Sequence, residues 1–254
     1  MRTKRILEIE KYILQKGNAT LDEICLEFGV SKSTLRRYLE EITEKGVIKK
    51  TYGGVTAEQC APLLSFSARN ATGAEAKRKI AALAADQVED GDVIFVDSGT
   101  TTLYMADALA DFNNLTVLTN SLEVIVRLLP YENVTVISLS GELNRETVSF
   151  TGQSAADVLG VYNIGKAFLA CTGVSVAGGV SNSSEAERMV KQTAVSKSQS
   201  VYLLADSRKF EVISLITYCG IDKIDTLISD KDPPQELMQE LETCGTKLLI
   251  ADDE

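Results

Sequence analysis

Apolar positions along most of the chain follow two patterns, short continuous runs and recurrences with helical spacing. Past residue 75, continuous runs of strand length alternate with helical segments. The runs lie at residues 93–97, 115–120, 134–140, 166–173, 200–206, 224–230 and 246–252, and the helical segments at 77–88, 101–109, 121–129, 184–197 and 234–244. Continuous apolar runs are typical of strands buried on both faces, and strand–helix alternation is typical of parallel sheets. We therefore predict a larger, mostly parallel α/β domain over residues 75–254.

Three shorter helical patterns come before this domain. Ile residues recur at helical spacing over residues 6–13. Thr20 and Glu23 have the spacing of a capping box that opens a second helix. Ser31 is a suitable N-cap for a third helix, KSTLRRYLEEITEK, which Gly46 can terminate. The chain therefore opens with three closely spaced helices.

Two β-like runs flank Gly53-Gly54 directly after the third helix. The order of three helices, a turn and a β-hairpin is that of a small winged helix-turn-helix, which we predict over residues 1–56. Residues 57–74 lack clear periodicity and contain Pro, Gly and small polar residues. They are predicted to be a linker between the two domains.

The third predicted helix has a basic polar face opposite its apolar one, which carries Leu35, Leu39 and Ile42. Arg and Ser in the first turns of such a helix can reach base edges or phosphates in the major groove of DNA. The alternative is a surface that is merely solvated. The candidate DNA-binding residues of this helix and of the hairpin are Ser31, Lys32, Ser33, Thr34, Arg36, Arg37, Lys49, Lys50 and Tyr52.

The distribution of charge favours the DNA-binding interpretation, although the whole chain has a net charge of −10. Residues 1–56 contain 11 Lys and Arg against 8 Asp and Glu, a net charge of +3. The remaining residues contain 15 Lys and Arg against 28 Asp and Glu, a net charge of −13. An acidic domain is repelled by DNA, so the two domains are predicted to have different partners.

Composition restricts the available chemistry. The chain has no His, which removes the commonest general base and the commonest metal ligand. Its five Cys residues have no metal-ligand or redox spacing, so we expect reduced thiols in a cytoplasmic protein. No apolar run reaches the roughly 18 to 20 residues that span a bilayer. We expect no catalytic residues, metal or cofactor.

The segment DSGTTT, residues 97–102, joins a predicted strand to a predicted helix. A glycine permits close backbone approach, threonines offer hydroxyl donors, and a helix N-terminus offers free N–H groups to a phosphate. Ser98 or Thr100 could equally serve only to cap the helix. Neither the P-loop nor the dinucleotide-binding pattern is present in this segment.

Polar residues also follow several other predicted strands, which favours a polar ligand, because ligands of parallel sheets bind beyond the carboxyl ends of the strands. The candidate ligand-binding residues at these strand ends are Asp97, Ser98, Gly99, Thr100, Thr101, Thr102, Thr119, Asn120, Gly141, Thr172, Gly173, Asp206 and Lys209.

The run FGVSKSTLRRYLEEITEKGVIKKTYGGVT, together with DSGTT, TNS and LLADSRKF, resembles the DeoR family of bacterial repressors over nearly the whole chain. The resemblance implies a winged helix-turn-helix joined to a sensor domain similar in fold to ribose-5-phosphate isomerase and CoA-transferase-like enzymes. It implies operator DNA and a phosphorylated sugar as partners. Residues 98–102 would hold the phosphate, Asp97, Asn120, Glu185 and Lys191 would face sugar hydroxyls, and Asp206 and Lys209 would close the site.

The chain departs from the family pattern at a few positions. Tyr38 replaces the usual Asp, and Leu35 replaces a β-branched residue. Ser175 stands where the family often has Asp, and Glu211 where a Gly is usual. These departures bear on operator contacts and on which sugar hydroxyls are recognised.

Three functions are compatible with these features. The first is a repressor of a carbohydrate operon that is controlled by a phosphorylated sugar and acts as a homodimer or homotetramer. The second is a sugar-phosphate isomerase or deaminase in which Glu185, Lys191 and Asp206 act as acid and base. The third is an architectural DNA-binding protein with an inert second domain. The first accounts for both the basic N-terminal helix and the polar strand ends.

Overall fold

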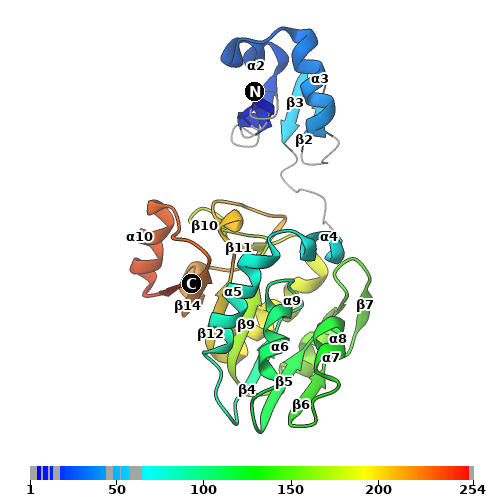
Figure 1. The fold of residues 1–254 in the computed structure, drawn as a ribbon, viewed down its shortest axis with the longest axis vertical. Helices are drawn as coiled ribbons and strands as arrows, with labels where there is room; N and C mark the ends of the chain where they lie inside the picture. Colours follow the sequence, from blue (N-terminus) through cyan, green and yellow to red (C-terminus); the bar gives the residue numbers. More distant parts are fainter. Residues whose placement is uncertain are drawn as a thin grey trace. The chain divides into compact units, whose positions relative to one another are not determined.

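The computed structural model describes residues 5, 6, 8–10, 12, 13, 18–43, 48–51, 53–57 and 65–251. The chain divides into two compact units, Met1–Leu63 and Leu64–Glu254. Each unit has its own hydrophobic core. Figure 1 shows the elements of both units along the chain.

The N-terminal unit is a helix-turn-helix with a small antiparallel sheet. Its two fully described helices are α2 (Leu21–Phe28) and α3 (Lys32–Thr43). Strands β1 (Asn18–Thr20), β2 (Ile48–Thr51) and β3 (Gly54–Ala57) form the sheet in the order β1-β3-β2. The predicted winged helix-turn-helix fold is confirmed.

Local sequence sets the ends of α2. Thr20 Oγ1 accepts the N–H of Glu23 at 3.2 Å, and Glu23 Oε2 accepts the N–H of Thr20 at 2.8 Å, which completes the capping box. Gly29 ends the helix with a φ of 60°, a left-handed conformation that favours glycine. Before α2, the described residues between 5 and 13 are helical, and their isoleucines are buried with those of α2 and α3.

The C-terminal unit is built on a sheet of seven parallel strands. In spatial order these are β15 (Lys247–Ile250), β14 (Thr226–Ser229), β12 (Ser198–Leu204), β9 (Ile164–Ala170), β4 (Val93–Val96), β5 (Leu115–Thr119) and β6 (Val134–Ser138). The predicted parallel α/β architecture is confirmed.

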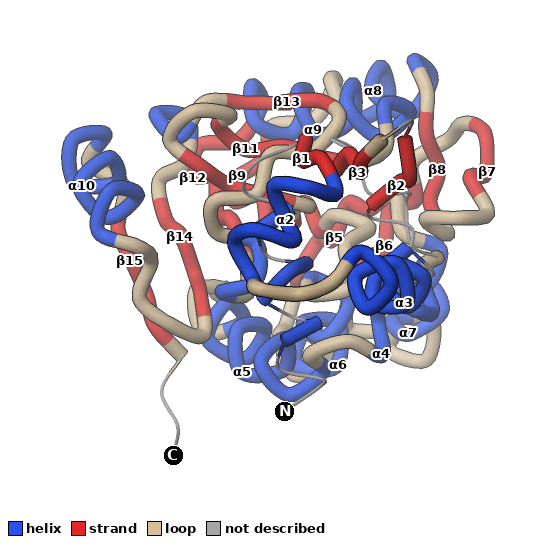
Figure 2. The backbone as a smooth tube through the Cα atoms, turned by 90° about the horizontal axis from the view of Figure 1, so that it is seen from above, coloured by secondary structure: helices blue, strands red, loops and turns tan. Residues whose placement is uncertain are grey.

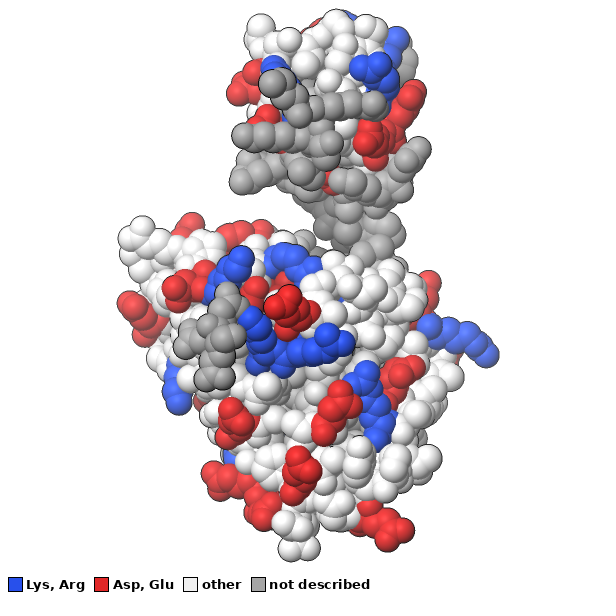
Figure 3. All heavy atoms as spheres, in the orientation of Figure 1, with Lys and Arg blue, Asp and Glu red and all other residues white. Residues whose placement is uncertain are grey.

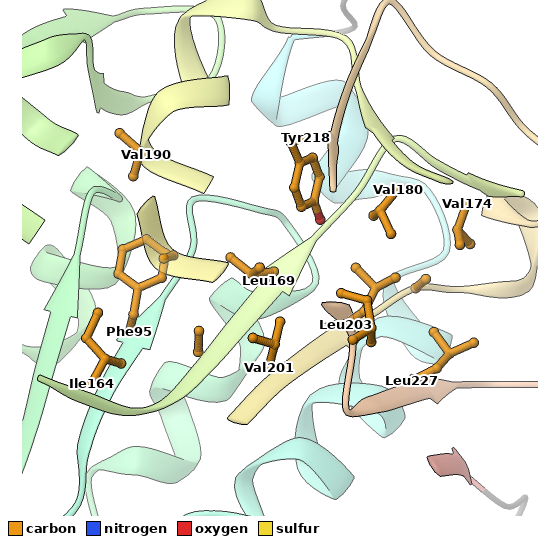
Figure 4. Packing of buried hydrophobic residues seen from close by; sticks show 14 of the residues in the cluster. Phe95, Ile164, Leu169, Val174, Val180, Val190, Val201, Leu203, Tyr218 and Leu227 are labelled. Atoms are coloured by element: carbon orange, nitrogen blue, oxygen red, sulfur yellow. The ribbon is translucent and has the colours of Figure 1, made fainter. Parts of the chain in front are cut away.

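Helices cover both faces of this sheet (Figure 2). One face packs against α4 (Phe66–Ala71), α5 (Ala74–Ala85), α6 (Met105–Leu109) and α7 (Leu122–Leu128). The other face packs against α8 (Gln153–Leu159), α9 (Glu185–Lys197) and α10 (Gln235–Cys244). Because strand side chains alternate between faces, Phe95 joins the second cluster while Ile94 and Val96 join the first. Figure 4 shows Phe95 of β4 with Leu169 of the adjacent strand β9 and Val201 of β12, which lies beyond β9.

Smaller elements lie outside the main sheet. They are the antiparallel sheet of β10 (Gly173–Ser175), β11 (Gly179–Asn182) and β13 (Ile216–Cys219), the hairpin of β7 (Glu142–Asn144) and β8 (Ser149–Thr151), and the 3-10 helices η1 (Thr102–Tyr104), η2 (Ser207–Lys209) and η3 (Ile221–Lys223). The run predicted as one strand over 166–173 is therefore divided between β9 and β10. The predicted linker, 57–74, includes α4, whose Phe66 is buried in the core of the C-terminal unit.

The order of the strands places a topological switch point at the centre of the sheet. From β4 the chain proceeds through β5 to β6 at one edge, and it then returns to β9 on the other side of β4. Strands β12, β14 and β15 extend the sheet in that second direction. Ligands of open parallel sheets bind beyond the carboxyl ends of the strands at such a point.

Candidate functional site

Asp97, the first residue after β4, lies at the switch point and has no exposed surface. Its backbone N–H donates to the carbonyl of Phe168 at 3.0 Å. Its Oδ2 accepts the N–H of Ala170, the last residue of β9, at 3.0 Å. Asp97 therefore joins the carboxyl ends of the two central strands.

Lys191 of α9 forms a buried ion pair with Asp97 Oδ2. The same ammonium donates to the carbonyl of Ala170 at 2.9 Å and lies 5.3 Å from the centre of the Tyr218 ring. Because an unpaired buried charge is costly, the pair depends on both partners. The structure thus brings Asp97 and Lys191 together, and their contact with a sugar stays a prediction.

Glu187, one helical turn before Lys191, is the second buried carboxylate of the cluster. It accepts hydrogen bonds from Ser98 Oγ at 2.8 Å, Ser149 Oγ at 3.2 Å and Asn182 Nδ2 at 2.8 Å. Glu185, which the sequence suggested for this role, is exposed at the start of α9. The structure therefore brings Glu187, and not Glu185, to the polar cluster.

The hydroxyls of DSGTTT have distinct partners. Thr102 Oγ1 donates within its own loop, to the carbonyls of Asp97 at 2.7 Å and Gly99 at 2.9 Å. Thr100 Oγ1 instead accepts from Nζ of Lys77 at 2.8 Å. Thr101 is also buried. A Cβ on Gly99 would lie 2.2 Å from Cβ of Ala170, so this loop can approach β9 only with glycine there.

The loop after β5 contributes one side chain to the cluster. Asn120 Nδ2 donates to Ser98 Oγ and to the carbonyl of Phe150, both at 3.3 Å. Asn120 Oδ1 and Asp97 Oδ1 are buried and accept no hydrogen bond from the described residues. Thr119, by contrast, donates at 2.6 Å to the carbonyl of Val96, which links β5 to β4. The cluster thus retains two unused buried acceptors.

Three other candidate residues make contacts that give each of them a structural role. Gly141 is exposed, with a φ of 131°, and a Cβ there would lie 2.3 Å from the carbonyl of Thr151. Gly173 lies so close to Val212 that a Cβ would be 2.1 Å from its carbonyl oxygen. Thr172 Oγ1 contacts Asn182 Oδ1 at 3.2 Å, which connects it indirectly to Glu187.

Asp206, which follows β12, is fully buried and is held by Arg208 through two hydrogen bonds of 2.7 and 2.9 Å. Burial by itself raises the pKa of Asp206, but the hydrogen bonds from Arg208 and the charge of Lys209 outweigh it and lower the pKa below its ordinary value. Lys209 is half-buried, and its charge also acts on Lys77 and Cys171. This strand end therefore adds cations to the same edge.

Lys77 and Arg69 are two cations of the site that were not among the candidates. Burial lowers the pKa of the Lys77 ammonium to about 8, and neighbouring cations act in the same direction. Burial also lowers the pKa of Arg69, while the charges of Glu187 and Asp97 act to raise it. Lys77 stands three residues before the buried Ile80 on the inner face of α5. A lysine in that apolar stripe was the signal that could have identified it.

The N-terminal unit presents its candidate residues on α3. Lys32, Ser33, Arg36 and Arg37 are exposed, and Figure 3 shows Lys and Arg side chains gathered where α3 lies. Ser31 Oγ accepts the N–H of the half-buried Thr34 at 3.3 Å, as expected of an N-cap.

The structure describes only some of the hairpin residues that are predicted to contact DNA. Lys50 in β2 is exposed. Tyr52 and the side chain of Lys49 lie outside the described residues.

Two further features are absent from the described residues. These residues contain no group of three or more His, Cys, Asp or Glu side chains that could hold a metal ion. Nor does any described helix combine the length and apolar character needed to cross a membrane.

Comparison with known proteins identifies both units. Residues 5–59 match the DeoR-like helix-turn-helix domain, and residues 72–231 match the DeoR C-terminal sensor domain. A solved ribose-5-phosphate isomerase from Methanocaldococcus jannaschii is similar with a TM-score of 0.41 and 18% identity over 55% of each chain.

Curated relatives match nearly the full length. The HTH-type transcriptional regulator IolR of Bacillus subtilis is 40% identical over 94% of this chain and 95% of its own. The glycerol-3-phosphate regulon repressor of Escherichia coli is 29% identical over the same shares. The winged helix-turn-helix, the parallel α/β domain and these matches show that the chain belongs to the DeoR family of transcriptional regulators.

Proposed function

We propose that this regulator represses a carbohydrate-related operon and releases its operator when a phosphorylated sugar binds at the switch point of the sensor domain. The N-terminal unit supplies the DNA contacts. The carboxyl edge around β4, β9 and β12 supplies the sugar-phosphate site. The observation that carries the proposal is the surplus of positive charge at this edge.

The surplus favours an anionic ligand such as a phosphate ester. Asp97, Glu187 and Asp206, together with Asp230 beside Arg208, contribute four negative charges. The cations that pair with them or act on them are Arg69, Lys77, Lys191, Arg208 and Lys209. The remaining positive charge of one attracts an anion, and a phosphate ester carries about −1.5 to −2 near neutral pH. Thr100 beside Lys77 fits the predicted phosphate-holding role of residues 98–102.

The two unused acceptors support a hydroxylated ligand. Asp97 Oδ1 and Asn120 Oδ1 can each accept a hydrogen bond from a sugar hydroxyl. A buried acceptor without a partner is costly, so hydroxyl donors would stabilise this part of the site. We propose Asp97, Asn120 and Lys191 as the sugar-facing residues, with Glu187 in the role first given to Glu185.

The DNA contacts are proposed for the exposed residues of α3 and for the wing. Arg36 and Arg37 carry permanent charges on the exposed face of α3, where they can contact bases or phosphates. One winged unit covers a half-site, so we propose a homodimer or homotetramer on a two-fold symmetric operator.

The function is tested by fluorescence anisotropy of labelled DNA from upstream of the protein's own gene. The protein is titrated alone, and then with glucose 6-phosphate, ribose 5-phosphate, glycerol 3-phosphate and their unphosphorylated counterparts. Release by a phosphorylated compound, but not by its counterpart, is the expected result. Binding to DNA that none of these compounds changes would contradict the proposed effector class.

An isomerase activity is the second candidate, and the geometry favours it less. Each buried carboxylate is already bound, Asp97 by Lys191 and Glu187 by three donors. Burial raises the pKa of Cys171 to about 12, so its thiol stays protonated at neutral pH. We expect no conversion of ribose 5-phosphate. Turnover lost in Glu187→Gln would instead establish an enzyme.

A further inference from the structure

The polar cluster of the sensor domain is closed to solvent. Asp97 and Asn120 have no exposed surface, and Lys191 and Glu187 are 3% and 6% exposed. A phosphorylated sugar that contacts these side chains therefore needs a neighbouring segment to move. The question is which segment covers them.

The C-terminal end of α4 is bound by cations of the site. Nζ of Lys77 bridges Thr100 Oγ1 and the backbone carbonyl of Arg69, at 2.8 and 2.5 Å. Arg208, while it holds Asp206, donates at 3.2 Å to the carbonyl of Thr72, the C-cap of α4. Figure 1 shows α4 beside the start of α5, which carries Lys77. Two cations that can face a phosphate thus bind the last carbonyls of α4.

The charges of the cluster also act on a side chain of α4. The negative charges of Glu187 and Asp97 act on the guanidinium of Arg69, which is largely withdrawn from solvent. That guanidinium also lies 5.7 Å from the centre of the Phe66 ring in the same helix. The guanidinium of Arg69 in α4 is therefore within electrostatic range of the two buried carboxylates.

The helix has little stability of its own. It contains six residues, and helices shorter than about 12 to 15 residues are marginal in water without tertiary contacts. Its N-cap bond, from the N–H of Ala68 to Ser65 Oγ, is 3.4 Å long. Its N-terminus is attached to the β7–β8 hairpin by the N–H of Phe66 and the carbonyl of Glu146 at 2.9 Å. The docked position of α4 therefore depends on the burial of Phe66 and on the contacts at both of its ends.

We propose that α4 is a lid over the sugar-phosphate site and that its release transmits sugar-phosphate binding to the DNA-binding unit. Phosphate oxygens displace the Arg69 and Thr72 carbonyls from Lys77 and Arg208, because hydrogen bonds between two charged groups are the stronger ones. Residues 58–64 connect α4 to the winged unit, so release of α4 alters that unit's attachment. The inference rests on the proposed function.

Mutual exclusion of docked α4 and bound phosphate has a reciprocal consequence. A change that weakens α4 favours the released state, so phosphate affinity rises while affinity for operator DNA falls. Ala68→Gly is such a change, since Ala68 is exposed within α4 and its side chain is outside the polar cluster. Glycine at this position costs about 1 kcal/mol, which corresponds to at most about a fivefold shift.

The first test compares Ala68→Gly with Ala82→Gly, the same substitution at an exposed position of α5. Calorimetry with inorganic phosphate measures the affinity of the sensor site, and anisotropy without phosphate measures operator affinity. We expect Ala68→Gly to bind phosphate up to about fivefold more tightly and operator more weakly, with Ala82→Gly unchanged in both. If the two variants have equal affinities for phosphate and for operator DNA, the proposal that α4 is a lid is wrong.

The second test uses the unaltered chain. Hydrogen exchange of the peptide covering residues 65–73 is measured with and without saturating inorganic phosphate. Faster exchange with phosphate is expected from a released α4, whereas unchanged or slower exchange overturns the proposal. If phosphate releases the operator but leaves this peptide unchanged, the lid alone fails. If neither phosphate nor the sugar phosphates bind, the proposed function fails with it.

Discussion

Lys77 is buried beside the candidate phosphate loop, and its charge state is therefore expected to affect the affinity of the proposed site. It is 3% exposed and donates to Thr100. With a pKa near 8, the ammonium is charged at neutral pH and becomes neutral in mildly alkaline solution. A bound phosphate favours the charged form, so phosphate binding is expected to raise this pKa.

The first prediction is that an effective sugar phosphate binds more weakly as pH rises through about 8. Above pH 7.5 a phosphate ester is already mostly dianionic, because its second pKa is about 6. Deprotonation of Lys77 is then the event that weakens binding. Calorimetry between pH 7.5 and 9.5 should show a falling affinity for the unaltered chain. Lys77→Met should be weaker at pH 7.5 and nearly independent of pH.

Lys79→Met is the matched control for this prediction. Lys79 lies on the same helix and pairs with Glu75 at 3.9 Å. The control should keep both the affinity and the pH dependence of the unaltered chain. An equal pH dependence in Lys77→Met would assign the effect to another group of the site.

Arg36 is the residue of α3 for which base reading is expected. We predict that Arg36→Ala weakens operator binding by about 1 to 3 kcal/mol and relaxes the preference at one base pair. Competition anisotropy against operator variants measures both quantities, with Arg145→Ala, an exposed arginine of the sensor domain, as the control. The same loss on every DNA sequence would make Arg36 a phosphate contact.

At the scale of elements, the loop after β4 is held against β9 by a steric requirement. Gly99 faces Cβ of Ala170, and an added methyl group would overlap it at 2.2 Å. Gly245, which ends α10 with a φ of 74°, has open space around it instead. Gly99 is therefore required by packing, whereas Gly245 is required by its backbone conformation.

Gly99→Ala is predicted to displace the DSGTTT loop and to remove phosphate binding, at a cost of about 1 to 3 kcal/mol in unfolding free energy. Gly245→Ala should cost about 1 kcal/mol through backbone strain and leave phosphate binding intact. Urea unfolding and phosphate calorimetry on both variants provide the measurements. Normal phosphate affinity in Gly99→Ala would show that the loop does not hold the anion.

These elements can be predicted from sequence where neighbouring residues determine them. The strand run at residues 93–97 and the capping box at Thr20 depend on neighbouring residues, and both appear as predicted. The choice between Glu185 and Glu187 depends on how α9 is rotated against the sheet, which is a tertiary property. The cover provided by α4 depends on Lys77 and Arg208, which lie far apart in sequence, and so it was not predicted.

At the scale of the whole molecule, the two ends of the chain carry net charges of opposite sign. The first 56 residues carry +3 and the remainder −13, so DNA attracts one part of the chain and repels the other. A single winged unit with so small a charge has limited affinity for DNA on its own. The proposed homodimer would overcome this limit, because binding of the second half-site becomes intramolecular.

The last prediction concerns this linkage. On a duplex with one half-site scrambled, a chain that binds as a dimer should lose about 10²-fold or more in affinity, because the second contact is lost completely. A chain that binds as independent monomers should lose only about twofold, the statistical factor for one site in place of two. Anisotropy with intact, half-scrambled and fully scrambled duplexes at one fixed salt concentration distinguishes these outcomes. Adding an effective sugar phosphate should then reduce affinity for the intact operator toward that for the half-scrambled duplex. If release leaves the ratio of the two affinities unchanged, the sugar phosphate acts within each DNA-binding unit and not on the pairing of two units.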